Sequence, residues 1–540
     1  MTKALLVGLM AVLGMAVQAQ EALLSAEERY YDFLALEGRV ERPYLNYRTL
    51  SDSRWALVEG EGLWRGNNKG RVQSLTESLS LRIYGPTVFS SYNSAEPFGQ
   101  NDAALWQGRG LNSSLDAGLR LEGYGFELTF KPQLTFSQNQ AFDLMPSGYE
   151  SPYGYIWAGF VDAPQRFGDK PLFGYSWGDS ELRYAWRNLT IGFGTQEPWI
   201  GPGRINAILH SNNAPPYPKL DLGLRKSRLD VFGLNFGEVE GRLWGGYLSE
   251  SAFFDSEPSN DHNLISGIAL AYAPSLVKGL TLFANRTYLS KWQPDSVNTF
   301  ASLLFFKFNA DGAGDKWDQR VSIGYDFLLP DAGFETYGEA GINDNPGPNF
   351  DSYERNFSHT VVYTGGLRKR FPLDFAGNEL DGQLTFEWSN LEMSPAYSQF
   401  LWANTFYMHG QITQGYTNEG QWLGVGTGTG GNSQYMGLDV YHARGSVTLY
   451  AHRYNPDNDF VMRFTTPSAG SPANDIYDKR FKAVLAVGVQ SHTYIASSFS
   501  VDAGVAWIRI DDPLYATGGA WYDSDIVNGF RIELGCAYHQ

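Results

Sequence analysis

From about Ser78 to the end of the chain, long segments alternate apolar and polar residues with a period of two. Clear examples lie at 126–137, 182–186, 321–327, 380–388 and 499–507. This period is that of a β-strand with one apolar and one polar face, because successive side chains of a strand point to opposite sides. Full charges occur among the polar residues, so one face of these strands meets water along its whole length.

Two architectures fit this alternation. A soluble sandwich or propeller turns its apolar faces toward a core, whereas a transmembrane barrel turns them toward lipid, with aromatic residues at the interfaces. The segments here are long, tryptophan and tyrosine occur at their ends, and no repeat of about 40 to 50 residues is visible. We therefore predict an all-β fold, a large antiparallel transmembrane β-barrel of about 16 to 18 strands. Its last strand, Phe530 to Tyr538, is expected to pair with the first.

The composition agrees with strands at a boundary between lipid and water. Aromatic residues make up 15% of the chain and charged residues only 18%, whereas soluble domains carry about 25% charged residues. Beyond the N-terminus there is no run of about 18 apolar residues that could form a membrane-spanning helix. The single cysteine, Cys536, excludes an internal disulfide. The formal charge of −17 argues against a nucleic-acid partner, which requires a basic surface.

The N-terminus has the layout of a secretory signal peptide. Lys3 precedes an apolar run from Ala4 to Val17, which is too short to span a bilayer and is followed by small residues. We expect residues 1–19 to be this signal peptide and residues 20–77 to form a small helical element, periplasmic or plugging the barrel. Residues 78–540 are then the outer-membrane β-barrel.

Within the N-terminal element, the spacing of apolar residues predicts a helix from Ser25 to about Val40. Ser25 and Glu28 have the spacing of a capping box, which favours a helix start at this point. A second short helix is predicted at Val72–Leu75.

Two rigid loops interrupt the alternation, at Glu197–Arg204 and at His210–Pro218. Their prolines cannot donate to a β-ladder and push the preceding residue out of helical geometry. Gly201 and Gly203 allow turns that a side chain would block. The loops flank a short apolar run, Ile205 to Leu209. Such a pair of loops is better suited to shaping a surface or a pore lining than to carrying a nucleophile.

Aromatic and amide side chains in and near polar loops are candidates for contacts with sugars. Rings pack against the apolar faces of sugars, and amides match their hydroxyl groups. The candidates are Trp199, Asn212, Asn213, Tyr217 and Trp422, and the aromatic residues Trp402, Tyr407 and Tyr416 share this character. The alternative is that these rings belong to an interfacial girdle or fill the barrel lumen, and the sequence leaves both interpretations open.

The loop pair also resembles the signature of the Wzi family of outer-membrane capsule assembly proteins. The signature residues here are Gly201, Pro202, Gly203, Ser211, Ala214 and Pro215. Further blocks that resemble the family lie at 91–112, 161–169, 415–424, 430–434 and 453–455. The chain departs from the family at Ile200 and Arg204, and Arg204 is a candidate contact for an acidic sugar.

The resemblance implies an outer-membrane β-barrel of about eighteen strands with helical elements at the N-terminus. It also implies a non-enzymatic role in attaching or organising capsular polysaccharide or a related exopolysaccharide at the bacterial surface. The partners expected on this basis are the polysaccharide, the lipid of the outer membrane and polysaccharide export machinery. No cofactor is expected.

Two other functions fit parts of the sequence. A porin for small solutes is compatible with the acidic, wet inner face. An outer-membrane hydrolase would depend on Ser176, because Gly174–Gly178 matches the nucleophile-elbow pattern, but an alternating segment follows it instead of a helix. A polar turn is the better interpretation. The histidines are scattered without ligand spacing, so no metal site is predicted.

Overall fold

The computed structural model of the protein describes residues 26–48, 56–57, 64, 73–147, 149–154, 159–293, 317–343, 354, 361–375, 377–392, 406–461, 480–515 and 524–539. The helical elements are α2 (Ala26–Leu36) and the 3₁₀ turn η1 (Pro330–Ala332). The strands are β1 (Val40–Glu41), β2 (Tyr47–Arg48), β3 (Ala56–Leu57), β4 (Gln73–Thr76), β5 (Leu79–Asn93), β6 (Gly110–Gly123), β7 (Phe126–Phe130), β8 (Gln133–Ser137), β9 (Leu172–Ser176), β10 (Glu181–Trp186), β11 (Leu189–Gly194), β12 (Trp199–Ile200), β13 (Lys219–Val231), β14 (Leu234–Ser249), β15 (His262–Pro274), β16 (Leu280–Lys291), β17 (Asp318–Leu329), β18 (Phe334–Ile342), β19 (Val361–Phe375), β20 (Asn378–Asn390), β21 (Thr417–Asn418), β22 (Gln421–Trp422), β23 (Asn432–His442), β24 (Gly445–Asn455), β25 (Ala483–Ala496), β26 (Phe499–Asp511) and β27 (Ile526–Tyr538).

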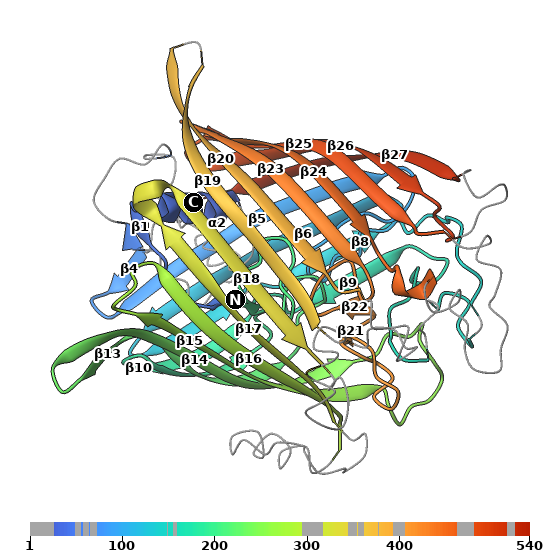
Figure 1. Ribbon diagram of the computed structural model, residues 1–540, viewed down its shortest axis with the longest axis horizontal. Coiled ribbons are helices and arrows are strands. Elements are labelled where there is room, and N and C mark those ends of the chain that lie inside the picture. Colours follow the sequence, from blue (N-terminus) through green and yellow to red (C-terminus); the bar gives the residue numbers. More distant parts are fainter. Residues whose placement is uncertain are drawn as a thin grey trace, which may run out of the picture.

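Within these ranges, one antiparallel sheet of twenty-one strands closes on itself to form a barrel (Figure 1). The circle closes where β27 pairs with β5, with Cys536 opposite Val88 and Arg531 opposite Asn93. At two places in the wall, two short strands lie end to end and together take the place of one long strand. These pairs are β7 with β8 and β9 with β10. The short β4 is an addition to β5. The described wall therefore has eighteen strands, which confirms the predicted barrel and its closing strand.

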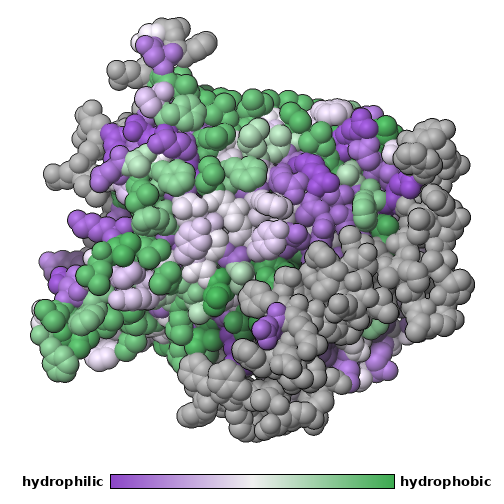
Figure 2. Space-filling model, in the orientation of Figure 1, coloured by the Kyte–Doolittle hydropathy of each residue, from purple (hydrophilic) through white to green (hydrophobic). Residues whose placement is uncertain are grey.

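The strands turn apolar side chains outward and polar side chains inward. On β10, Leu182 and Trp186 are 50% and 59% exposed, whereas Arg183 between them is 1% exposed inside the barrel. In Figure 2, apolar and weakly polar residues cover most of the visible strands, and strongly hydrophilic residues gather toward the two ends. The alternation in sequence thus becomes an apolar outer surface around a polar interior, as predicted.

The two ends of the barrel differ in their connections. One end has short turns, such as residues 187–188, 232–233 and 443–444, and the other has long connections, such as 94–109, 138–171, 195–218 and 391–431. The helix α2 lies inside the barrel at the short-turn end, where a Cβ on Gly38 would lie 3.1 Å from Pro330 of η1. The barrel therefore has two different openings, one beside α2 and one beneath the long connections.

The N-terminal helix is shorter than the sequence predicts. It ends at Leu36 because Gly38 adopts a left-handed conformation, with φ of 73°, that terminates helices. The second predicted helix, Val72–Leu75, is wrong, since residues 73–76 form β4 and the edge of β5 offers them a backbone ladder. The predicted signal peptide lies outside the described residues. Among the residues that the structure describes, no helix has the length and apolarity needed to cross a membrane.

Candidate functional site

The first rigid loop folds into the barrel and lies against the N-terminal segment. Trp199 and Ile200 form β12, which pairs with Tyr47 and Arg48 of β2. The indole N–H of Trp199 donates to the carbonyl oxygen of Gly203 at 2.9 Å. The guanidinium group of Arg48 lies 5.0 Å from the centre of the Trp199 ring. Trp199 is thus held between the turn and the N-terminal segment.

The turn in this loop leaves no room for a side chain at its glycines. Gly201 has φ of 105°, and a Cβ at this position would lie 2.5 Å from a carboxylate oxygen of Glu339 on β18. A Cβ on Gly203 would lie 2.4 Å from the carbonyl oxygen of Asn206. Both positions therefore require glycine for close approach to their neighbours.

The carboxylate of Glu387 on β20 holds the end of the turn. It accepts the backbone N–H groups of Arg204 at 2.5 Å, Ile205 at 3.1 Å and Asn206 at 2.7 Å. It also accepts the hydroxyl of Tyr337 at 2.8 Å. Four donors compensate for the burial of this charged group, so the barrel wall fixes the backbone of the first rigid loop.

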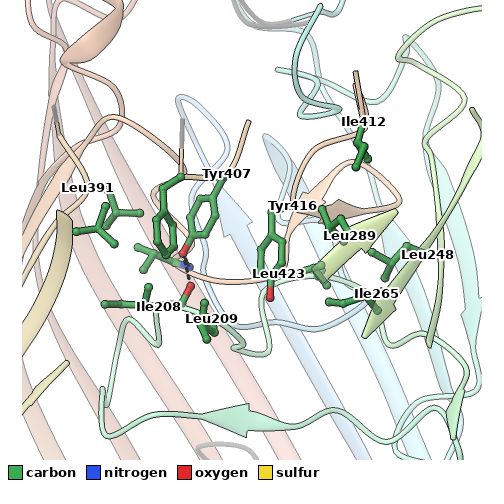
Figure 3. Packing of buried hydrophobic residues seen from close by; sticks show 14 of the residues in the cluster. Ile208, Leu209, Leu248, Ile265, Leu289, Leu391, Tyr407, Ile412, Tyr416 and Leu423 are labelled. Atoms are coloured by element: carbon green, nitrogen blue, oxygen red, sulfur yellow. Dashed lines mark hydrogen bonds between the residues drawn. The ribbon is translucent and has the colours of Figure 1, made fainter. Parts of the chain in front are cut away.

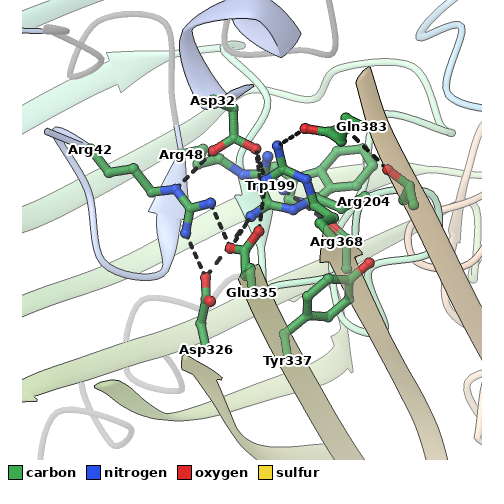
Figure 4. A network of polar contacts seen from close by, with 12 residues as sticks. Asp32, Arg42, Arg48, Trp199, Arg204, Asp326, Glu335, Tyr337, Arg368 and Gln383 are labelled. Carbon is green, nitrogen blue, oxygen red and sulfur yellow. Dashed lines mark hydrogen bonds and ion pairs between the residues drawn. The ribbon is translucent and has the colours of Figure 1, made fainter. Parts of the chain in front are cut away.

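The Arg204 side chain enters a buried cluster of three guanidinium groups and three carboxylates (Figure 4). We call Asp32, Arg42, Arg204, Asp326, Glu335 and Arg368 the ion cluster. Arg204 binds Asp32 of α2 at 3.1 Å and Glu335 of β18 at 2.8 Å. Arg42 and Arg368 bind the same two carboxylates at distances between 2.5 and 2.8 Å. The cluster joins α2, the first rigid loop and the barrel wall.

The ion cluster predicts that acid loosens α2. Burial opposes ionisation of Asp32, but the guanidinium groups of Arg204, Arg368 and Arg42 outweigh it and hold the pKa of Asp32 well below its ordinary value. A carboxyl group whose pKa is lower in the folded state stabilises that state above its unfolded pKa of about 3.9 and loses this effect as the pH falls further. We expect hydrogen exchange of residues 26–48 to report a loss of about 1 kcal/mol per pH unit below about pH 4.

This acid dependence is tested by comparing the wild type with the Asp32→Asn variant, which has no carboxyl group to titrate. The exposed Asp230→Asn on β13 is the control, since its side chain is 48% exposed. Equal slopes of stability against pH in wild type and Asp32→Asn would contradict the assignment.

A hydrophobic core fills part of the barrel between the rigid loops and the connection 391–431 (Figure 3). This plug core consists of Ile208, Leu209, Ala214, Tyr217, Leu248, Ile265, Leu289, Val362, Leu391, Phe406, Tyr407, Ile412, Tyr416, Leu423 and Val425. The Tyr407 hydroxyl donates to the carbonyl oxygen of Ile208 at 2.5 Å and accepts the N–H of Val425 at 2.9 Å. The plug core occupies lumen that a diffusion porin would keep open.

The second rigid loop is fastened to the same connection by its polar residues. The backbone N–H of Ser211 donates to the carbonyl oxygen of Leu423 at 2.8 Å, and the Ser211 hydroxyl donates to the carbonyl oxygen of Gly424 at 2.6 Å. The ring of His210 lies between the Tyr217 hydroxyl, 2.9 Å from Nε2, and the Ser211 carbonyl oxygen, 3.0 Å from Nδ1. Burial, together with the charge of Lys219, lowers the pKa of His210 to about 3. The ring is therefore neutral at physiological pH and acts as a hydrogen-bonding brace.

The amides of Asn212 and Asn213 hold the segment of residues 98–103, which we call the partition. The side-chain oxygen of Asn213 accepts the N–H of Asn101 at 3.2 Å. The Asn212 side-chain amide donates to the Asn101 carbonyl oxygen at 3.1 Å, and the Asn212 carbonyl oxygen accepts the N–H of Ala103 at 2.9 Å. Asn101 and Ala103 have positive φ values of 61° and 52°, a conformation that asparagine tolerates but alanine rarely adopts. The rigid loop thus supports an otherwise unfavourable backbone.

A cavity of about 280 Å³ lies among the long connections, and we call it the outer cavity. It is lined by Trp422, Asn213, Gln100, Thr427 and Trp106, among others. Thr427 Oγ1, Gln100 Oε1 and Trp106 Nε1 are buried and have no hydrogen-bond partner among the described residues. An unsatisfied buried polar atom costs about 1–3 kcal/mol. These atoms are therefore the polar groups of cavity-lining residues that protein contacts leave unsatisfied.

The structure separates the predicted sugar contacts into two groups. Asn213 and Trp422 line the outer cavity, and the Asn213 side-chain amide donates to the Trp422 carbonyl oxygen at 3.4 Å. The other four, Trp199, Arg204, Asn212 and Tyr217, are only 1%, 8%, 6% and 1% exposed. The signature residues Gly201, Pro202, Gly203, Ser211, Ala214 and Pro215 are buried as well. Protein groups surround these four side chains, so the four support the folded loops and do not form the surface of the outer cavity. Tyr407 and Tyr416 belong to the plug core, and Trp402 lies outside the described residues.

Ser176 lacks the geometry of a nucleophile elbow. It ends β9, its hydroxyl oxygen accepts the N–H of Gly178 at 3.0 Å, and the next regular element is the strand β10. The elbow requires a helix directly after the serine, with the hydroxyl presented to substrate. The predicted polar turn is limited to the residues that follow Ser176, because Gly174, Tyr175 and Ser176 belong to β9.

A family model described as capsule assembly protein Wzi matches residues 174–506 of the chain. The chain belongs to this Wzi family. Among solved structures, it is similar to Wzi of Escherichia coli, described as an outer-membrane, carbohydrate-binding β-barrel involved in group 1 capsule assembly, at 12% identity and a TM-score of 0.57. The match covers 96% of this chain and 99% of that one, and at this identity it shows the shared fold.

Other barrels are less similar to this Wzi-family chain. OprB of Pseudomonas putida has 12% identity and a TM-score of 0.36, covering 85% of this chain and 94% of its own. DcaP of Acinetobacter baumannii, an outer-membrane channel, has 9% identity and a TM-score of 0.33, covering 87% and 99%. Likenesses this distant carry no functional argument. No curated protein sequence matches the chain.

Gln100, Trp106 and Thr427 line the outer cavity but are not among the contacts predicted from the sequence. Gln100 and Trp106 stand in the block 91–112 that resembles the Wzi family, and Thr427 stands beside the block 415–424. Their position in or beside blocks rich in amides, aromatics and glycine is the signal that could have found them. Their convergence on one cavity depends on how three separate connections fold over the barrel.

Proposed function

We propose that the chain is a non-enzymatic outer-membrane protein that binds capsular polysaccharide, or a related surface polysaccharide, at the outer cavity. The observation that carries this proposal is the meeting of the Trp422 ring with the unpartnered polar atoms of Thr427 and Gln100 in one cavity. A ring packs against the apolar face of a sugar, and such polar atoms bind its hydroxyl groups. The carbohydrate binding described for the Escherichia coli protein supports the same class of ligand.

In this proposal, residues 1–19 direct export and residues 20–77 stay at the periplasmic opening of the barrel. Outer-membrane barrels have short turns on the periplasmic side and longer loops outside, so the long connections face the surroundings of the cell. The outer cavity is then accessible to polysaccharide at the surface. The short-turn opening, with α2, is the side that polysaccharide export machinery can reach.

The Trp422→Ala variant tests the outer cavity. We expect its dissociation constant for the surface polysaccharide of the producing cells to rise about tenfold, which corresponds to about 1.4 kcal/mol, because a ring at the centre of a contact supplies much of the binding energy. Binding is measured by isothermal titration with the purified protein in detergent micelles.

The matched control is Trp186→Ala, which removes a tryptophan that is 59% exposed on the outer face of β10 and should leave the dissociation constant unchanged. Equal affinity of wild type and Trp422→Ala would count against the outer cavity. In cells, an unchanged amount of cell-bound polysaccharide after deletion of the gene would count against the proposed function itself.

A further inference from the structure

A second cavity, of about 460 Å³, lies inside the barrel. We call it the inner cavity. Strands β23 to β27 and β5 form its wall, Ala26 and Arg29 of α2 border it at the short-turn end, and the partition borders it on the other side. Phe98, Gln100 and Asp102 of the partition line both cavities. The two cavities are therefore neighbours separated by one short segment of chain.

Aromatic rings form a strip along one wall of the inner cavity. Tyr450, His452 and Tyr454 are alternate residues of β24 and all line the cavity, while Leu449, which precedes Tyr450, is 54% exposed on the outer face. The Tyr435 ring of β23 lies 6.2 Å from that of Tyr450 and 5.9 Å from that of His452, and the rings of His452 and Tyr454 are 5.1 Å apart. From Tyr450 to Tyr454 the strip extends about 14 Å along the strand.

Hydrogen-bonding groups form the wall beside this strip, on β25 to β27. Gln490 donates to Glu533 at 2.5 Å, and the Arg531 guanidinium binds the same carboxylate at 3.0 Å. His492 Nδ1 lies 2.8 Å from Asp502, which leaves Nε2 buried without a hydrogen-bond partner among the described residues. His492 is 7% exposed and Asp502 presents a side chain that is 44% exposed, and both line the cavity.

The arrangement matches the surface of a sugar on two sides. Flat aromatic rings accept the apolar faces of pyranose rings, and the amide, imidazole and carboxylate groups beside them accept or donate to hydroxyl groups at the edges of those rings. Arg531 is paired with Glu533, and the remaining charged groups at the cavity include both Arg29 and Asp502. Since charges of both signs are present, an uncharged ligand fits better than a strongly acidic or basic one.

We propose that the inner cavity is a second carbohydrate site, which binds a short, linear, uncharged oligosaccharide along the strip of Tyr435, Tyr450, His452 and Tyr454. The proposal goes beyond the outer cavity and rests on the proposed function only for the class of ligand. The inner cavity lies next to the partition. Only this segment of the protein therefore separates an oligosaccharide in the inner cavity from polysaccharide in the outer cavity.

The test uses the full chain in detergent micelles and isothermal titration with two uncharged probes. They are maltotetraose and cellotetraose. We expect at least one probe to bind the wild type. Tyr450→Ala should weaken that binding about fivefold to tenfold, and Tyr450→Phe, which keeps the ring, should retain it. Acidic tetragalacturonate should bind more weakly than the best uncharged probe.

Two further variants separate the cavities and control for the substitution. Trp422→Ala, in the outer cavity, should leave binding of the probe unchanged. Tyr325→Ala, which removes a tyrosine that is 39% exposed on the outer face of β17, should do so too. The proposal is overturned if no uncharged probe binds, if Tyr450→Ala binds as tightly as wild type, or if Trp422→Ala abolishes the binding. Failure of the outer cavity alone would instead appear as unchanged binding of whole polysaccharide by Trp422→Ala.

Discussion

Replacing Arg204 with alanine is expected to lower the local stability of α2 and the first rigid loop by about 3–5 kcal/mol, the usual cost of removing one partner of a buried ion pair. The Arg204 side chain is 9% exposed, and its guanidinium group binds Asp32 and Glu335. Without this guanidinium group, the buried carboxylates of Asp32 and Glu335 each lose one positively charged partner, and water does not replace it. Hydrogen exchange of residues 26–48, followed by mass spectrometry, should report this loss as faster exchange.

A surface ion pair provides the control for Arg204. Arg228 on β13 binds Asp230 at 2.9 Å, but the two side chains are 65% and 48% exposed. Arg228→Ala should therefore cost no more than about 1 kcal/mol and leave the exchange of residues 26–48 unchanged. Exchange at the wild-type rate in Arg204→Ala would show that the ion cluster does not hold α2.

The barrel could be predicted because its determinants are local and repeated. On β10, the apolar Leu182 and Trp186 point outward and the polar Arg183 points inward. This is the orientation that the alternating sequence predicts, and the other strands repeat the pattern. The N-terminal element was harder to predict from the sequence. Residues 73–76 became a strand because the edge of β5 lies beside them, and a pairing partner is not visible in a short window of sequence.

The site was harder to predict because aromatic and amide side chains in loops suit binding and packing equally well. Trp199 and Tyr217 have the character of sugar contacts, but Arg48 covers the Trp199 ring and Tyr217 joins the plug core. Arg204 has the character of an anion contact, but the carboxylates of the ion cluster already occupy it. Partners far away in the sequence decide each outcome.

The blocks that resemble the Wzi family meet one another in space. Asn101, in block 91–112, is held by Asn213 of the second rigid loop. Asp162, in block 161–169, donates its N–H to the carbonyl oxygen of Gln414, the residue before block 415–424, at 2.9 Å. Asn418 of that block donates its side-chain amide to the carbonyl oxygen of Pro215 at 2.9 Å. The resemblance therefore marks the loop assembly that closes the barrel and shapes the outer cavity, which explains why the six signature residues are buried.

Glu387→Ala is expected to have the largest effect on binding through this assembly. The variant removes the acceptor of three backbone N–H groups and of the Tyr337 hydroxyl. Each buried donor left without a partner costs about 1–3 kcal/mol, so the first rigid loop loses several kcal/mol of stability. Because the second rigid loop holds the partition through Asn212 and Asn213, we expect binding of polysaccharide at the outer cavity to fall below detection.

The order of three variants distinguishes this mechanism from general damage to the barrel. Glu387→Gln keeps one carbonyl oxygen in place and should lose affinity to an intermediate degree. Glu238→Ala on β14 removes a glutamate that is 38% exposed and pairs with Lys226 at 3.3 Å, so it should bind polysaccharide as the wild type does. All three should keep the barrel, seen as an unchanged β-sheet circular dichroism spectrum. Wild-type binding by Glu387→Ala would mean that the outer cavity does not depend on the rigid loops, since the backbone anchor on β20 would then be dispensable.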